Sequence, residues 1–179
     1  MRKILTVLLL ITCPATGFSP ETPKSNQPDL SGTWVLDMDR SNFGGPKSDL
    51  IYDSLTLVIE HREPEIKIRR ILVKKRKETT HTLTYYTDHR GEVNKSPSQS
   101  QTKSKARWED NKLIITEATS MAVPGNAIYI DSIDTWELTD SGRILVQTTT
   151  SRMDGGVGRT IILDRDKNTT TQKIYRKVN

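Results

Sequence analysis

Short segments in which apolar and polar residues alternate run through most of this chain. Leu55, Leu57 and Ile59 share one face of an extended segment, and after a turn with a proline Ile66 and Ile68 continue the same pattern. A period of two is typical of a β-strand that is buried on one face only. The pattern therefore predicts a pair of half-buried antiparallel strands.

The alternation changes phase within the second of these segments. Ile71 and Val73 fall out of step with the apolar residues before them. A shift of one residue would turn the apolar side chains to the other face of a sheet, unless an extra residue is accommodated. The sequence therefore predicts a β-bulge near Arg69 and Arg70.

Further extended segments follow at the spacing of hairpins, with no helical period of three or four residues between them. They comprise residues 33–36, 79–87, 105–109, 112–118, 127–138, 143–151, 159–163 and 169–178. Turn residues separate them, most clearly Asp110 and Asn111. We expect an all-β fold, an antiparallel up-and-down β-barrel of about eight to ten strands, because closure removes exposed strand edges.

Two stretches interrupt the alternation. Residues 88–103 are polar and contain Gly91 and Pro97, and residues 121–126 contain a Pro-Gly pair. Such compositions indicate loops. We expect a long mobile loop over 88–103 and a shorter loop over 121–126.

The period-two positions also predict which side chains share the interior. Twelve apolar residues are expected to point into one common core. They are Leu57, Ile59, Ile66, Ile68, Leu83, Tyr85, Trp108, Leu113, Ile115, Trp136, Leu138 and Leu145.

The first expected strand carries a recognisable phrase. Gly32 and Trp34 form a Gly-x-Trp sequence, followed by Asp37 and by Ser-Asn-Phe-Gly at residues 41–44. This resembles the lipocalin-like, or calycin-type, small secreted bacterial proteins. The resemblance implies a barrel that binds a small apolar or amphipathic ligand, with Arg176 of the last strand packed against Trp34. The chain lacks room for the long helix that lipocalins carry after the barrel.

The pattern of residues at the N-terminus indicates an export signal. A basic start, an apolar run over residues 4–13 and small residues around Gly17 are typical of a secretory leader. We expect a signal peptide over 1–17, a flexible arm over 18–29 rich in Pro, Ser and Asn, and a lipocalin-like domain over 30–179. The protein is then secreted or periplasmic. A loose lipoprotein box before Cys13 leaves a lipid anchor through that cysteine as the alternative.

Charge and composition limit the classes of molecule that the protein is expected to bind. The 179 residues are 34% hydrophobic and 27% charged, and removing Arg2 and Lys3 with the leader leaves 25 basic against 22 acidic residues, a net charge of +3. This charge is too small to indicate nucleic acid, and no segment is long enough to span a membrane as a helix. Basic residues gather at 69–77 and predict weak attraction to anionic surfaces, with a solvated hairpin tip as the alternative.

We find no pattern that indicates catalysis or a cofactor. The three histidines, His61, His81 and His89, lack the spacing of a metal site, and no Gly-x-Ser-x-Gly sequence is present. The glycines at 155–158 indicate a turn, because no Lys-Ser or Lys-Thr pair of a phosphate loop follows them. The sequence predicts a protein that is not an enzyme and has no metal or cofactor.

Two functions stay open. The first is a monomeric barrel that binds a small apolar ligand, which enters opposite Trp34 and contacts Tyr85, Trp108 and Trp136. These aromatics offer wide contact area with polar atoms for orientation, although plain core packing explains them as well. The alternative is an envelope barrel without a cavity that binds or inhibits another protein.

Overall fold

A computed structural model describes residues 27–45, 50, 52–95, 100–123, 126–154 and 168–178. The signal peptide expected over 1–17, most of the arm over 18–29, the glycine-rich turn over 155–158 and the strand expected over 159–163 lie outside these residues. Export and lipidation at Cys13 therefore stay predictions.

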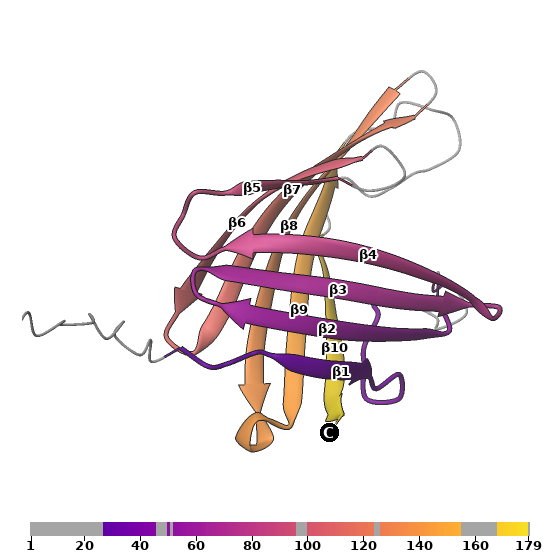
Figure 1. The fold of residues 1–179 in the computed structure, drawn as a ribbon. Coiled ribbons are helices and arrows are strands. Elements are labelled where there is room, and N and C mark those ends of the chain that lie inside the picture. Colours follow the sequence, from indigo (N-terminus) through magenta and orange to yellow (C-terminus); the bar gives the residue numbers. More distant parts are fainter. Residues whose placement is uncertain are drawn as a thin grey trace, which may run out of the picture.

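Ten antiparallel strands make up the described structure (Figure 1). They are β1 (Gly32–Leu36), β2 (Ser54–Arg62), β3 (Glu65–Lys74), β4 (Lys77–Tyr86), β5 (Glu92–Lys95), β6 (Gln101–Glu109), β7 (Lys112–Val123), β8 (Asn126–Thr139), β9 (Ile144–Asp154) and β10 (Thr169–Val178). The described residues contain no α-helix, only the short 3₁₀ turn η2 (Asp140–Gly142). No helix among them is long and apolar enough to cross a membrane.

The strands form a nearly closed up-and-down barrel, which confirms the predicted fold class. Their order is β4-β3-β2-β1-β10-β9-β8-β7-β6-β5, so each strand pairs with its neighbour in sequence and β1 joins β10. In Figure 1, β1–β4 cross in front of the more upright β6–β10. Only the seam between β4 and β5 lacks a backbone ladder.

The predicted core is confirmed in full. Each of the twelve predicted residues either belongs to one buried hydrophobic cluster or packs against it. Leu83, Trp108 and Leu138 are the three that are only partly buried. The other nine, including Trp136 and Ile115, are almost completely inaccessible to solvent.

The predicted β-bulge near Arg69 and Arg70 is wrong. Strands β2 and β3 pair without a break from Ser54 opposite Val73 to Arg62 opposite Glu65. Arg70 lies opposite the buried Leu57, so its side chain continues the inward face. The apparent change of phase arises because a charged residue occupies an inward position.

The long loop expected over 88–103 is also wrong, since it contains β5 and the start of β6. The loop expected over 121–126 is shorter than predicted, because β7 extends to Val123 and β8 begins at Asn126. The hairpin through Asp110 and Asn111 is confirmed, with Asp110 at a positive φ of 53°.

Lys177, rather than Arg176, covers the Trp34 indole. The Lys177 ammonium lies 5.1 Å from the centre of the ring, whereas the Arg176 guanidinium lies 3.3 Å from an Asp37 carboxylate oxygen. Gly32 makes this arrangement feasible, because a Cβ there would lie 2.7 Å from the Lys177 side chain, and because its φ of 138° disfavours other residues. In the Gly-x-Trp sequence, Gly32 thus leaves space for the Lys177 side chain, whose ammonium group packs on the Trp34 indole.

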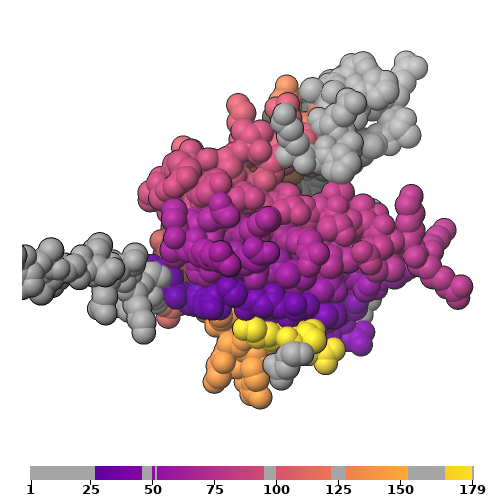
Figure 2. All heavy atoms as spheres, viewed as in Figure 1, coloured from indigo at the N-terminus to yellow at the C-terminus, as the bar shows by residue number. Residues whose placement is uncertain are grey.

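The basic turn between β3 and β4 projects from the body of the molecule (Figure 2). Lys75 and Arg76 form the turn with positive φ angles of 47° and 68°, and both are exposed. The expected attraction of this turn to anionic surfaces stays a prediction.

Candidate ligand site inside the barrel

On β7 and β8, the inward-facing positions are buried toward the Trp34 end of the barrel and become partly exposed toward the other end. On β7, Ile115 has no exposed surface, whereas Thr119 is partly exposed. On β8, the same change falls between Trp136 and Ile130. We call the buried part, next to Trp34, the filled half of the barrel, and the partly exposed part, toward the β3–β4 turn, the open half.

A polar layer separates the two halves. The Tyr175 hydroxyl donates to Gln147 Oε1 at 2.9 Å, and Gln147 Nε2 donates to Asp134 Oδ2 at 2.6 Å. The Tyr85 hydroxyl donates to Glu117 Oε1 at 2.8 Å. No buried polar side-chain atom of the described residues lacks a hydrogen-bond partner. A network satisfied in this way holds its members in fixed orientations.

Two cations lie next to the polar layer. Arg70 follows Ile68 along the inward face of β3, and Lys173 precedes Tyr175 on β10. Within the described part of the chain, neither side chain forms a hydrogen bond or an ion pair within 4.0 Å. Because no buried polar atom is left without a partner, the nitrogens of both side chains keep some exposed surface.

The surroundings of these cations affect their protonation. Burial lowers the pKa of Lys173, and the nearby charge of Arg70 lowers it further. Burial raises the pKa of Glu117, and the charge of Asp134 raises it as well. Burial acts to lower the pKa of Arg70, but the neighbouring Tyr85 and Asp134 raise it above its ordinary value. Two cations thus lie near the two acidic groups of the layer, but these acidic groups already accept hydrogen bonds from other side chains.

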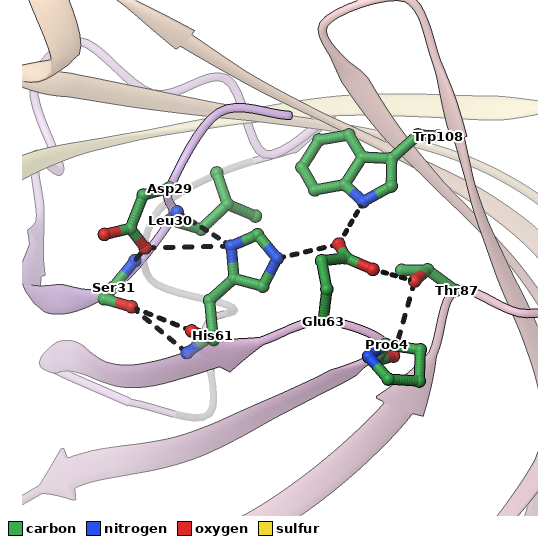
Figure 3. A network of polar contacts seen from close by, with 8 residues as sticks. All are labelled: Asp29, Leu30, Ser31, His61, Glu63, Pro64, Thr87 and Trp108. Carbon is green, nitrogen blue, oxygen red and sulfur yellow. Dashed lines mark hydrogen bonds and ion pairs between the residues drawn. The ribbon is translucent and has the colours of Figure 1, made fainter. Parts of the chain in front are cut away.

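A second polar network closes the end of the barrel next to Trp34, which we call the sealed end (Figure 3). His61 Nε2 lies 2.8 Å from Glu63 Oε1, which also accepts a hydrogen bond from Trp108 Nε1 at 2.6 Å. The other Glu63 oxygen accepts a hydrogen bond from the Thr87 hydroxyl. The backbone N–H of Leu30 donates to His61 Nδ1 at 3.3 Å. The segment before β1 is thereby tied across the end of the barrel.

The sequence-predicted ligand residues occupy three different positions. Tyr85 belongs to the polar layer, and Trp136 lies beneath it with its Nε1 3.4 Å from Asp134 Oδ2. Trp108 lies at the sealed end, where its ring centre is 5.7 Å from that of His61. Ligand contact by these three residues stays a prediction, and among them Tyr85 is the one that interacts electrostatically with Arg70.

Sequence reasoning missed the two cations at inward positions. Arg70 looks like part of a solvated basic cluster in the sequence, although it continues the period of Ile66 and Ile68. Lys173 likewise alternates with Tyr175. A charged residue in step with an apolar face is the signal that would have found both.

The histidines lie apart from one another along the barrel. His61 lies in the sealed end, His81 faces inward on β4 opposite Arg70, and His89 is in the turn after β4. No group of three or more His, Cys, Asp or Glu side chains in the described ranges has a geometry that would hold a metal ion.

Comparison with known proteins adds no family. No protein-family model matches this chain, and no curated protein matches it. Among solved structures, the chain is similar to a mutant of the REP1-NXSQ fatty acid transporter, with 14% identity, 83% of this chain and 98% of that chain covered, and a TM-score of 0.48. It is also similar to a Schistosoma mansoni fatty acid binding protein in complex with arachidonic acid, with 15% identity, 84% and 96% covered, and a TM-score of 0.45. At these values we draw no functional conclusion from either likeness.

Proposed function

We propose that this protein binds an amphipathic small molecule with an anionic head group, without acting on it as an enzyme. The ligand enters the open half of the barrel from the end opposite Trp34. Its head group lies against Arg70 and Lys173, above the polar layer. The observation that carries the proposal is the pair of inward-facing cations without a hydrogen-bond or ion-pair partner among the described residues.

Electrostatics favours an anion at this position. A charged group in a protein interior is costly when it lacks a partner, and hydrogen bonds between ions are stronger than those between neutral groups. Asp134 and Glu117 are already engaged by Gln147 and Tyr85. The donors of Arg70 and Lys173 are therefore available for an oxyanion brought by a ligand.

The walls of the open half suit an apolar tail. Leu72 and Leu83 pack against the core but are only partly buried, and Ile130 faces inward on the opposite wall. A tail that covers these side chains removes apolar surface from water, which contributes roughly 0.8 kcal/mol for each buried CH₂ group. The ligand class is therefore amphipathic, with the head group deep in the barrel.

Paired titrations with decanoate and decanol test the role of the cations, with tryptophan emission as the signal. The two compounds share a tail and differ in the charge of the head. We expect decanoate to bind about tenfold more tightly, since a hydrogen bond to a charged group contributes about 1.5 to 3 kcal/mol. The Arg70→Met variant should lose this preference and bind both compounds alike.

Arg69→Met is the matched control, because Arg69 neighbours Arg70 but faces outward and is exposed. It should keep the preference for decanoate. An equal loss in both variants, or no saturable binding by a folded protein, would contradict the proposal and favour the protein-binding alternative. Native mass spectrometry of protein purified from its own host would then identify the natural ligand or partner.

A further inference from the structure

A second hollow lies on the outer face of the barrel. It has a volume of about 520 Å³ and extends over β6, β7, β8 and β9. Ile115 and Trp136 point inward, so the alternation places Thr116 and Ile133, which line the hollow, on the outer face. We call this hollow the outer groove. Along the strands it meets a smaller hollow of about 230 Å³, with Lys103, Ala118 and Asp131 shared between them.

The outer groove has an excess of unpaired positive charge. Lys103, Lys105 and Arg152 line it with the acidic residues Asp131 and Glu117. The Glu117 carboxylate is turned inward, where it accepts the Tyr85 hydrogen bond, so the outward side chains are three basic and one acidic. Among the described residues, none of these four side chains forms a hydrogen bond or an ion pair. Ion pairs on the outer surface are common elsewhere, as between Lys112 and Glu137 at 3.0 Å. An anion can therefore bind these basic side chains without first breaking an ion pair within the protein.

Apolar surface accompanies these charges. Ile133 is 50% exposed in the outer groove, and Tyr129, which lines the smaller hollow, is 56% exposed. Ala118, whose short side chain leaves room, lies between Lys103 and Asp131 in the register of the sheet. Large apolar side chains exposed in a hollow are typical of binding sites.

We propose that the outer groove is a second binding site, for an amphipathic small molecule with an anionic head group. The volume lies in the range of small-ligand sites. An extended peptide fits less well. The strands at the centre of the groove, β7 and β8, pair with strands on both sides and offer no free backbone groups. The site is separate from the open half and does not depend on the function proposed above.

Titration with anilinonaphthalene sulfonate tests the second site, since this probe is apolar, anionic and fluorescent when bound. The wild-type protein should bind one molecule in the outer groove, in addition to any molecule bound in the open half. The double variant Lys103→Gln/Arg152→Gln should weaken one site about tenfold, by the loss of hydrogen bonds to charged groups. The double variant Arg69→Gln/Lys77→Gln removes two exposed cations from other strands and should bind as the wild type does.

The Arg70→Met variant separates the two sites. It should leave outer-groove binding intact, whether or not the open half proves to bind a ligand. In the wild type, the probe should shift the backbone amide resonances of Ala118 and Ile133. If the groove variant binds the probe as its control does, or if these resonances stay unchanged, the proposal is wrong. Groove-dependent binding to phosphatidylglycerol vesicles without any effect on the soluble probe would instead indicate a membrane-docking surface.

Discussion

Glu63 connects three separate segments of the chain at the sealed end. Its carboxylate contacts His61 of β2, Thr87 after β4 and Trp108 of β6. Burial acts to raise the pKa of Glu63, but the hydrogen bonds from Thr87, His61 and Trp108 lower it below the ordinary value of 4.5. The folded state therefore favours the ionised carboxylate, and folding and ionisation of this residue are linked.

We predict that Glu63→Gln destabilises the protein at neutral pH and much less in acid. A lowered folded pKa contributes stability that is present above the unfolded pKa and is lost as the pH falls through the folded pKa. The loss at neutral pH should be about 1 kcal/mol, since glutamine still accepts hydrogen bonds but lacks the charge. Urea unfolding at neutral and at acidic pH measures it. The exposed Glu60→Gln is the control, and an equal effect at both pH values would argue against this role.

At the scale of elements, side chains close the seam that backbone pairing leaves open. The Thr84 N–H donates to Asn94 Oδ1 and Asn94 Nδ2 donates to the Thr84 carbonyl, both at 3.0 Å. The Tyr86 N–H donates to Glu92 Oε2 at 3.3 Å. One amide side chain of β5 thus replaces a backbone pair, which explains how so short a strand completes the barrel.

We predict that Asn94→Ala opens the seam locally. Without the side-chain amide, the Thr84 N–H loses its acceptor, and its hydrogen exchange should accelerate about tenfold. The amide of Leu83, which lies on the β3 side of β4, should exchange as before. Asn94→Asp retains the acceptor oxygen and should protect the Thr84 amide. Equal exchange at Thr84 in all three proteins would show that the bond has no protective effect.

The elements that the sequence predicts well are those whose inward face is apolar. The strands around Leu57, Ile115 and Leu145 are predictable because burial of one face enforces the period of two. Strand β5 escapes prediction because its inward Glu92 and Asn94 make hydrogen bonds at the seam instead of packing in the core. Arg70 escapes prediction because it is a charged residue at an inward position, and such departures from the apolar pattern are expected at functional sites.

At the scale of the whole molecule, stability and binding occupy different halves of one barrel. The filled half contains the fully buried side chains, such as Trp34, Leu113 and Trp136, and its end is sealed by hydrogen bonds. The open half has partly exposed inward positions and the two cations. A barrel filled throughout would gain apolar burial but would have no room for a ligand. The division predicts that equal truncations in the two halves have unequal effects.

Two isoleucine truncations test this division, because Ile115 and Ile130 both face inward on neighbouring strands. Ile115 is fully buried, so Ile115→Ala should cost about 2 to 5 kcal/mol of unfolding free energy through lost burial and a new cavity. Ile130 is only partly buried in the open half, so Ile130→Ala should cost about 1 kcal/mol or less. Decanoate binding should respond in the reverse order, with Ile130→Ala weakening it and Ile115→Ala leaving it close to wild type in the folded protein. Equal destabilisation by both truncations, measured by urea unfolding, would mean that the barrel is filled at both ends and has no open half.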